Sequence, residues 1–184
     1  MKKIFALAVI ALSTLTASAE GTYIGGSVGY WHSGENNTNH LTILPEIGFN
    51  LSKTWAVGTT VGYEYIHYCG AKESGNLFQV APYARFSYFR SSNNLVQLFI
   101  DGGVGFGAGW TSYDGDDSKT ACIWNIGLRP GIAINLSEKF SFVTHIGFLG
   151  YKGANNAAKS IGYYNEGGLK LDSNDLTIGF YYNF

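Results

Sequence analysis

The sequence has no apolar run long enough to form a membrane-spanning helix. The apolar run at residues 4–12 is far short of the ~20 residues that a helix needs to cross a bilayer. Charged residues are also scarce, at 14% of the chain against about 25% in an ordinary soluble domain. No basic run occurs, so nucleic acid is not an expected partner. The sequence therefore argues against both a helical membrane protein and a nucleic-acid-binding protein.

The residues that are abundant favour β-structure. Aromatic residues make up 16% of the chain, and there are 25 glycines and 13 tyrosines. Aromatic residues favour strands because they pack well on a pleated, half-buried surface. The composition predicts an all-β protein.

The first residues are typical of a secretory signal peptide. Lys2 and Lys3 precede the apolar run, and the small residues Ala17 and Ala19 frame a cleavage site before Glu20. We therefore expect residues 1–19 to be a cleaved signal peptide and residues 20–184 to form one domain of 184 − 19 = 165 residues. These features predict export past the inner membrane.

The last nine residues alternate between two kinds of side chain. A strand places successive side chains on opposite faces. One face is then small or polar, and the other is apolar and aromatic as far as the last residue. The apolar face consists of Leu176, Ile178, Phe180, Tyr182 and Phe184. In a membrane barrel such a face points outward to lipid.

Eight segments of the chain show this period of two. Three of the connections between them are short, at residues 52–54, 90–94 and 137–139, and the other four are long and polar. This alternation predicts an eight-stranded antiparallel up-and-down transmembrane β-barrel with turns at the periplasmic end and long loops outside. With the signal peptide, it leads us to expect the protein in the outer membrane of a Gram-negative bacterium. The expected strands cover residues 22–31, 41–51, 55–68, 77–89, 95–110, 121–136, 140–151 and the chain end from 169 or 174.

All three prolines fall inside expected strands. Pro45 and Pro130 begin an internal repeat that shares Asn-Leu-Ser and a following aromatic residue, and Pro82 begins a weaker copy. Proline cannot donate a ladder hydrogen bond. We therefore expect bulges or missing ladder bonds at these positions.

Taken in order, these motifs resemble a known family. The Pro-Glu-Ile-Gly-Phe-Asn-Leu-Ser hairpin from Pro45, Val61-Gly-Tyr63, Pro82-Tyr-Ala-Arg-Phe86 and the terminal Tyr-Tyr-Asn-Phe184 make the chain similar to small OmpX/OmpA-type outer-membrane barrels, in the porin-like family of Bacteroidota. The resemblance implies that residues 176–184 are the signal read by the barrel-assembly machinery. It also implies outer-membrane lipids and periplasmic chaperones as partners, and a monomer.

The inward face carries charged or titratable residues on six strands. Buried charges persist only when they are paired, and an eight-stranded barrel is just wide enough to be filled by its own side chains. We therefore predict a salt-bridged plug of Glu46, Asp101, Arg85 and Arg129 with no open pore. Glycines 103, 105, 107 and 109 would make room for larger groups opposite. The full set of lumen residues is Glu46, Glu64, Arg85, Asp101, Arg129 and His145.

No catalytic, cofactor or metal site is expected. His145 has Ser141 on its own face, but two pleats away, which is too far for the hydrogen bond that an activated nucleophile needs. The glycines at 102–109 do not precede a Gly-Lys-Ser/Thr motif, and the acidic residues at 114–117 lack the remaining spaced ligands of a calcium loop. Cys69 and Cys122 both lie at the long-loop end, where a disulfide could form.

Three functions remain open. The leading one is a structural or surface-presenting outer-membrane protein with a plugged lumen. The others are a narrow porin for small solutes and an adhesin or receptor that binds through its long loops, with residues 152–168 as a binding edge. A soluble lipocalin-like barrel is the architectural alternative.

Overall fold

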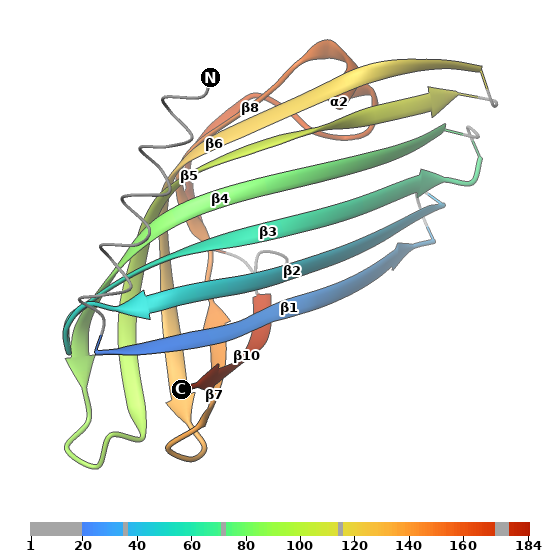
Figure 1. Ribbon diagram of the computed structural model, residues 1–184. Coiled ribbons are helices and arrows are strands. Elements are labelled where there is room, and N and C mark those ends of the chain that lie inside the picture. Colours follow the sequence, from blue (N-terminus) through green and yellow to red (C-terminus); the bar gives the residue numbers. More distant parts are fainter. Residues whose placement is uncertain (1–19, 35–36, 71–72, 114–115, 172–176) are drawn as a thin grey trace, which may run out of the picture.

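The computed structural model describes residues 20–34, 37–70, 73–113, 116–171 and 177–184. Most of these residues lie in antiparallel strands that wrap into a barrel (Figure 1). The strands are β1 (Gly21–Ser33), β2 (Thr38–Asn50), β3 (Trp55–Tyr68), β4 (Glu73–Arg90), β5 (Val96–Tyr113), β6 (Asp116–Asn135), β7 (Phe140–His145), β8 (Phe148–Ala154), β9 (Glu166–Lys170) and β10 (Thr177–Asn183). A short helix, α2 (Asn156–Ser160), separates β8 from β9. Within the described ranges no helix is long and apolar enough to cross a membrane. The expected signal peptide, residues 1–19, lies outside the described residues.

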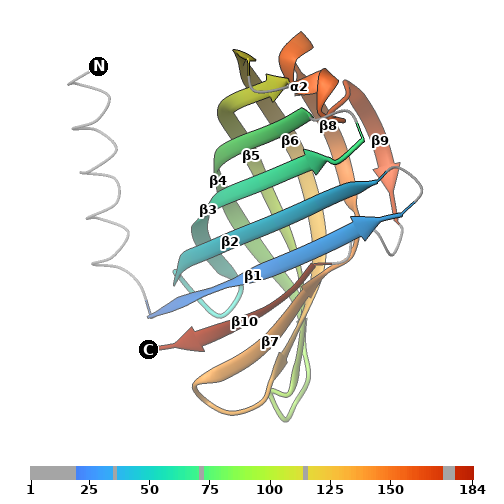
Figure 2. The same ribbon diagram turned by 90° about the vertical axis from the view of Figure 1, so that its right-hand side faces the viewer.

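The strands close into a ring with eight positions. Each strand from β1 to β6 pairs with the next one along the chain. β6 then pairs with β7 and β8 end to end, and β10 joins β7 to β1. β9 pairs with β8, so β7 and β8 share the seventh position, and β9 and β10 share the eighth (Figure 2). The predicted fold, an eight-stranded antiparallel up-and-down β-barrel, is confirmed.

The seventh position is divided by a bulge opposite Pro130. Leu128 of β6 pairs with Leu149 of β8, but Gly131 of β6 pairs with His145 of β7. An interval of three residues on β6 therefore faces an interval of four residues on the opposite segment. The extra residue falls at Gly147, whose φ of 78° favours glycine. The ladders of Pro45 with β3 and of Pro82 with β5 are also interrupted, without a change of register. The expectation of bulges or missing ladder bonds at the prolines is confirmed.

The two ends of the barrel differ, although less than the sequence predicted. The short turns at residues 51–54, 91–95 and 136–139 define what we call the short-turn end. At the opposite end the prediction of long loops was wrong for three connections, because β1 to β6 continue through most of the polar residues and leave gaps of two to four residues. Edge-to-edge pairing satisfies the backbone there, so polar side chains do not end the strands. The fourth long connection contains α2 and β9.

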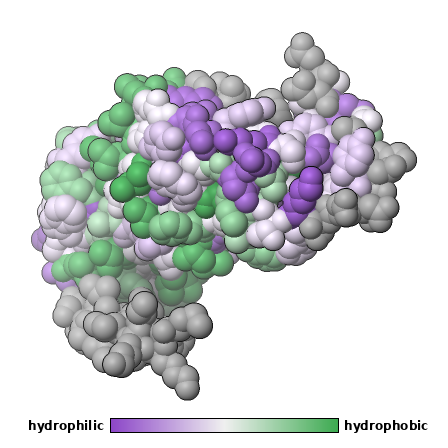
Figure 3. Space-filling view, turned by 90° about the horizontal axis from the view of Figure 1, so that it is seen from above, coloured by the Kyte–Doolittle hydropathy of each residue, from purple (hydrophilic) through white to green (hydrophobic). Residues whose placement is uncertain are grey.

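Apolar side chains cover the outside of the wall. Val28, Phe106 and Phe180 are 71%, 64% and 58% exposed, and each alternates with a small or buried neighbour. Figure 3 shows hydrophobic residues over much of one side and hydrophilic residues gathered from the centre towards the end opposite the short turns. Such an apolar outer surface is stable against lipid and costly against water.

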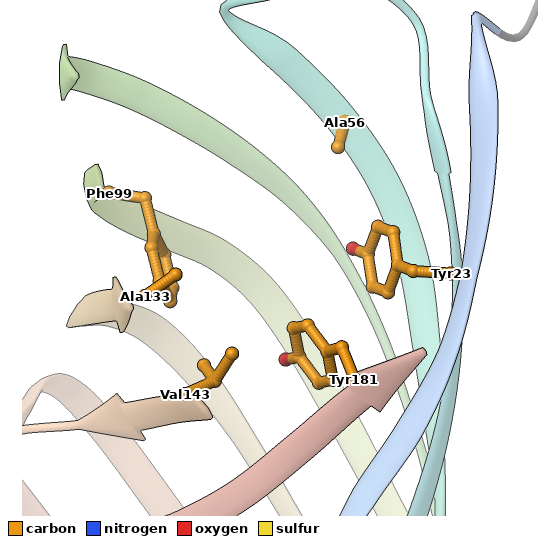
Figure 4. Packing of buried hydrophobic residues seen from close by; sticks show 6 residues of the cluster. All are labelled: Tyr23, Ala56, Phe99, Ala133, Val143 and Tyr181. Carbon is orange, nitrogen blue, oxygen red and sulfur yellow. The ribbon is translucent and has the colours of Figure 1, made fainter. Parts of the chain in front are cut away.

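The interior holds two apolar clusters at different heights. The one nearer the short-turn end places side chains from six strands inside the ring (Figure 4). Its members are Tyr23, Ala56, Phe99, Ala133, Val143 and Tyr181. The second cluster joins Leu77 and Ala121 of the wall to Ala158 and Ile161, which come from α2 and the residue after it. The α2 segment therefore packs into the opposite mouth of the barrel.

Candidate functional site in the barrel lumen

Arg85 is the centre of a buried polar cluster. Its Nε and Nη2 atoms donate to Asp101 Oδ1 and Oδ2, both at 2.7 Å, in a bidentate ion pair. The two residues face each other in the β4–β5 ladder, so strand register brings the charges together. Both side chains are buried, at 6% and 7% exposure. A bidentate geometry is the strongest arrangement available to this pair of groups.

Glu46 on β2 reaches Arg85 from across the lumen. It lies 3.5 Å from Arg85 Nη2 and accepts the hydroxyl of Tyr181 at 2.7 Å. The hydroxyl of Tyr83 also donates to it, and Tyr23 is bonded to Tyr83 through their hydroxyls at 2.6 Å. The carboxylate therefore has the several donors that a buried charge requires.

Four aromatic rings surround the Arg85 guanidinium. Its carbon lies 4.0 Å from the ring centre of Phe99, and 5.3–5.5 Å from those of Tyr23, Tyr83 and Tyr181. Cation–π attraction is strongest where water is excluded, as it is here. The sequence analysis did not identify this cage, although Tyr23, Tyr83 and Tyr181 stand on inward positions, where a large aromatic residue among glycines is a detectable signal.

His145 and Arg129 lie beside this cluster. His145 Nε2 is 2.8 Å from Asp101 Oδ2, and its ring packs edge-on against Phe99. Arg129 faces Asp101 in the β5–β6 ladder, and its guanidinium carbon is 5.8 Å from the Phe148 ring centre. The structure thus joins Glu46, Arg85, Asp101 and His145 through hydrogen bonds, and it places Arg129 on the wall beside them.

Glu64 belongs to a separate cluster nearer the opposite mouth. It accepts a hydrogen bond from Gln79 Nε2 at 2.6 Å and lies 3.3 Å from His40 Nε2. The hydroxyl of Tyr163, from the connection between α2 and β9, also donates to it. Burial, together with the Glu64 charge, raises the pKa of Tyr163, so the phenol keeps its proton and remains a donor. This contact ties the α2 segment to the wall.

Small inward residues give the large ones their space. A side chain at Gly48 would meet the Tyr23 ring, and one at Gly58 would meet the Tyr83 hydroxyl. On β5, Gly105 lies against Asn125 and Gly107 lies against Ile123, in keeping with the role expected for those glycines. Each of these large inward side chains therefore lies over a glycine at the paired position of the neighbouring strand.

The Arg85 cluster divides the cavities of the lumen. A cavity of about 610 Å³ opens at the short-turn end and reaches Arg85, Tyr23, Phe99 and Tyr181 at its base. We call this cavity the vestibule. Two small cavities of about 40 and 50 Å³ lie around Arg129 and His145, which is room for a few waters at most.

The cysteines do not form the disulfide considered from the sequence. Both thiols are free and exposed, and Cys69 Sγ accepts a hydrogen bond from Asn39 Nδ2 at 3.3 Å. Cys69 directly follows β3, Cys122 lies on β6, and β4 and β5 separate these two strands. At about 4.8 Å between neighbouring strands, the separation of the two cysteines exceeds the ~7 Å limit on the Cα–Cα distance of a disulfide.

The remaining expected sites are placed as follows. His145 is bonded to Asp101, whereas Ser141 is bonded to Asn135 and Asn183. No group of three potential metal ligands occurs among the described residues, and residues 114–117 have no described side chains.

In the expected assembly signal, Ile178, Phe180 and Phe184 are exposed on the outer face, and Tyr182 packs between Phe140 and Phe184. Leu176 lies outside the described residues.

Comparison with solved structures gives similar barrels at low sequence identity. The N-terminal β-barrel domain of Pseudomonas aeruginosa OprF has a TM-score of 0.53 and 15% identity, with 90% of this chain and 98% of that one covered. P. aeruginosa OprG gives 0.48 and 12%, with 90% and 97% covered. The attachment invasion locus protein Ail of Yersinia pestis gives 0.45 and 16%, with 89% and 97% covered. These likenesses concern the fold alone.

Comparison by sequence identifies the family. A search of curated proteins gives no match. The family model for the outer membrane protein beta-barrel domain matches residues 4–184, which is nearly the whole chain. With the closed ring, the apolar outer wall and the polar lumen already described, this match shows that the chain belongs to the family of outer-membrane proteins with a β-barrel domain.

Proposed function

We propose that this protein is an outer-membrane barrel with a closed lumen, and that its role is structural or the presentation of its outer end at the cell surface. The observation that carries the proposal is the buried pair of Arg85 and Asp101 with Glu46 opposite. Separating one partner of such a group typically costs about 3–5 kcal/mol, because a buried charge is left uncompensated. That cost would hold a spontaneously open state to roughly one molecule in a hundred or fewer.

A second obstruction supports the same proposal. Ile161 and Ala158 are almost fully buried against Leu77 and Ala121 at the opposite mouth, and Tyr163 is bonded to Glu64. A solute crossing the barrel would have to displace both this α2 segment and the Arg85 cluster. Two closures in series argue against the narrow-porin alternative.

Surface presentation is supported by the residues that follow α2. Tyr164, which lies between α2 and β9 at the end opposite the short turns, is 64% exposed. An exposed aromatic side chain beyond the membrane is available for a partner. This observation keeps the adhesin or receptor function as the second candidate.

Planar-bilayer recording tests the closed lumen. The wild-type protein should give no stable conductance, and a variant that replaces Arg85 by Ala and Tyr163 by Ala together should conduct. Arg90→Ala is the matched control, because Arg90 lies on the same strand and is exposed at the rim. A stable wild-type conductance that changes with the charge at Arg85 or Arg129 would contradict the proposal.

A further inference from the structure

A separate cavity lies on the inner face of β8 and β9, apart from the Arg85 cluster. These two strands lie side by side in the part of the wall away from the short turns (Figure 2). The cavity has a volume of about 110 Å³, which is room for a group of several non-hydrogen atoms. It is lined by Phe148, Gly150 and Lys152 of β8 and by the β9 residues Glu166–Lys170. We call it the β8–β9 pocket.

Strand register arranges this lining in three rows. Residues two apart on a strand share a face of the sheet, and each inward residue of β8 has an inward partner on β9. The three pairs are Lys152 with Glu166, Gly150 with Gly168, and Phe148 with Lys170. The middle row therefore carries no side chain, and a row with a charged side chain lies on each side of it.

Gly168 leaves the floor of the pocket open. A Cβ atom at Gly168 would meet no atom within 4 Å, and the φ of 145° favours glycine. Gly150 differs, because a Cβ atom there would lie 2.8 Å from the Phe148 ring. A strand glycine that makes room for no neighbouring side chain often marks a place where a ligand approaches the backbone.

Lys152 brings an ammonium group with unused donors to the pocket. Its Nζ atom lies 5.0 Å from the ring centre of Phe148 and 3.6 Å from Glu166 Oε1. The second distance is that of an ion pair, but it is too long for a hydrogen bond. Within the described part of the chain, the three N–H donors of this ammonium therefore make no hydrogen bond. The side chain is 36% exposed, so a ligand can reach these donors.

The charge of the pocket favours an anion. Its lining contains two lysines, Lys152 and Lys170, and one carboxylate, that of Glu166. Arg129 adds a cation next to Phe148, with its guanidinium carbon 5.8 Å from the ring centre. An anion entering the pocket would exchange water for charge-assisted hydrogen bonds from an ammonium group. A cation would meet a carboxylate that already lies beside Lys152.

We propose that the β8–β9 pocket binds a phosphate group. Lysine binds phosphate as a point charge, and the tetrahedral oxygens of a phosphate group can accept hydrogen bonds from both sides of the glycine row. In the outer membrane this part of the barrel faces outward. The headgroup of an outer-leaflet lipid and a phosphate-bearing solute outside the cell share this chemistry. The site does not depend on the closed lumen proposed above.

Nuclear magnetic resonance titration of the protein labelled with nitrogen-15 glycine tests the proposal. The protein is held in a maltoside detergent, which carries neither phosphate nor charge. Inorganic phosphate represents the free group, and dihexanoylphosphatidylglycerol represents the lipid headgroup. At least one of them should shift the amide resonances of Gly150 and Gly168 in a saturable manner, and sodium chloride of equal ionic strength should not. Gly58, which lies under the Tyr83 ring, should not respond.

Two variants with opposite effects and one control make the result specific. Lys152→Gln should weaken binding by about tenfold, the effect of losing one charge-assisted hydrogen bond. Glu166→Gln should strengthen binding by about threefold, because the competing carboxylate is removed from a partly exposed pair. Lys119→Gln is the matched control, since it removes an exposed lysine on β6 outside the pocket, and it should bind as the wild type does. Heat-modifiable gel migration shows that each variant is folded.

The outcomes separate the proposal from its alternatives. Saturable binding of inorganic phosphate shows that the free group is sufficient, and binding of the lipid alone identifies a lipid headgroup as the source. Absence of saturable shifts with both probes, or equal binding by Lys152→Gln and the wild type, overturns the proposal. Weaker binding by Glu166→Gln also overturns it, because the ion pair would then matter only for the structure. If Lys152→Gln does not fold, Lys170→Gln takes its place with the same expected loss. Bilayer conductance is measured separately, so an open lumen and an empty pocket are distinguishable failures.

Discussion

At the scale of single residues, the lumen depends on one cation and the groups that satisfy it. Arg85 has Asp101 on the neighbouring strand, Glu46 across the lumen and four rings around its guanidinium. None of these partners is replaceable by water, because the side chain is buried. The stability of the barrel should therefore respond more to the partners of Arg85 than to any charge at the rim.

Replacing Asp101 by Ala should destabilise the folded barrel by about 3–5 kcal/mol, because the buried Arg85 would lose both hydrogen bonds to its bidentate partner. Urea unfolding in lipid vesicles measures the change. Glu138→Ala, in an exposed turn, is the control and should alter the free energy of unfolding by less than about 0.5 kcal/mol. Equal effects of the two substitutions would contradict the role assigned to the ion pair.

At the scale of the elements, one residue sets the course of the seventh strand position. Gly147 lets β7 end and β8 begin one residue out of register, so that both His145 and Phe148 point inward. A side chain at Gly147 would collide with the Lys170 carbonyl, and its φ of 78° already disfavours other residues. The bulge thus depends on glycine.

Gly147→Val should destabilise the barrel by about 1–3 kcal/mol through backbone strain, in addition to the collision. Gly70→Val is the control, because a side chain there meets no atom within 4 Å. Under identical conditions, the free energy of unfolding should be lower for Gly147→Val than for Gly70→Val. A Gly147→Val barrel as stable as the Gly70→Val barrel would show that the bulge tolerates a side chain.

The last strand supplies a second prediction at this scale. Phe184 is 72% exposed and makes one aromatic contact, with Tyr182, so its removal should cost the folded barrel little. We nevertheless expect deletion of Phe184 to reduce outer-membrane levels while export continues, because the assembly machinery would read the terminal residue. Phe106→Ala, at an outer-face site that is 64% exposed, is the control. Wild-type levels of the truncated protein would refute the assembly role.

At the scale of the whole molecule, the two ends of the barrel have different chemistry. The short-turn end opens into a polar vestibule, whereas α2 and Ile161 pack into the opposite mouth. Both termini of the barrel domain lie at the short-turn end, since β1 begins and β10 ends there (Figure 2). This difference between the ends predicts that the short turns face the periplasm and that the end with α2 faces outward.

The cysteines allow the orientation to be measured. Cys69 is exposed at the end opposite the short turns, so an impermeant maleimide should label it on intact cells. In a variant with both native cysteines replaced by Ala, a cysteine introduced by Ser92→Cys in a short turn should react only after the outer membrane is permeabilised. The reverse pattern would show that the short turns face outward.

The sequence by itself determined the alternating faces, the number of strand positions, the turns at one end and the interruptions at the prolines. Each of these features follows from local chemistry: a period of two along a strand, a turn between two runs, a missing N–H at proline. It also identified Glu46, Arg85, Asp101 and His145 as inward groups, because inward and outward positions alternate.

Only the tertiary structure decided which of those groups meet. Tyr23 and Tyr181 come from opposite ends of the chain and contact each other because β1 pairs with β10 to close the ring. Glu64 faces inward as expected, yet its height in the barrel places it in a separate cluster with His40, Gln79 and Tyr163. The inward packing of α2 likewise depends on contacts with distant strands. Such contacts join residues far apart in sequence, so no local pattern of side chains encodes them.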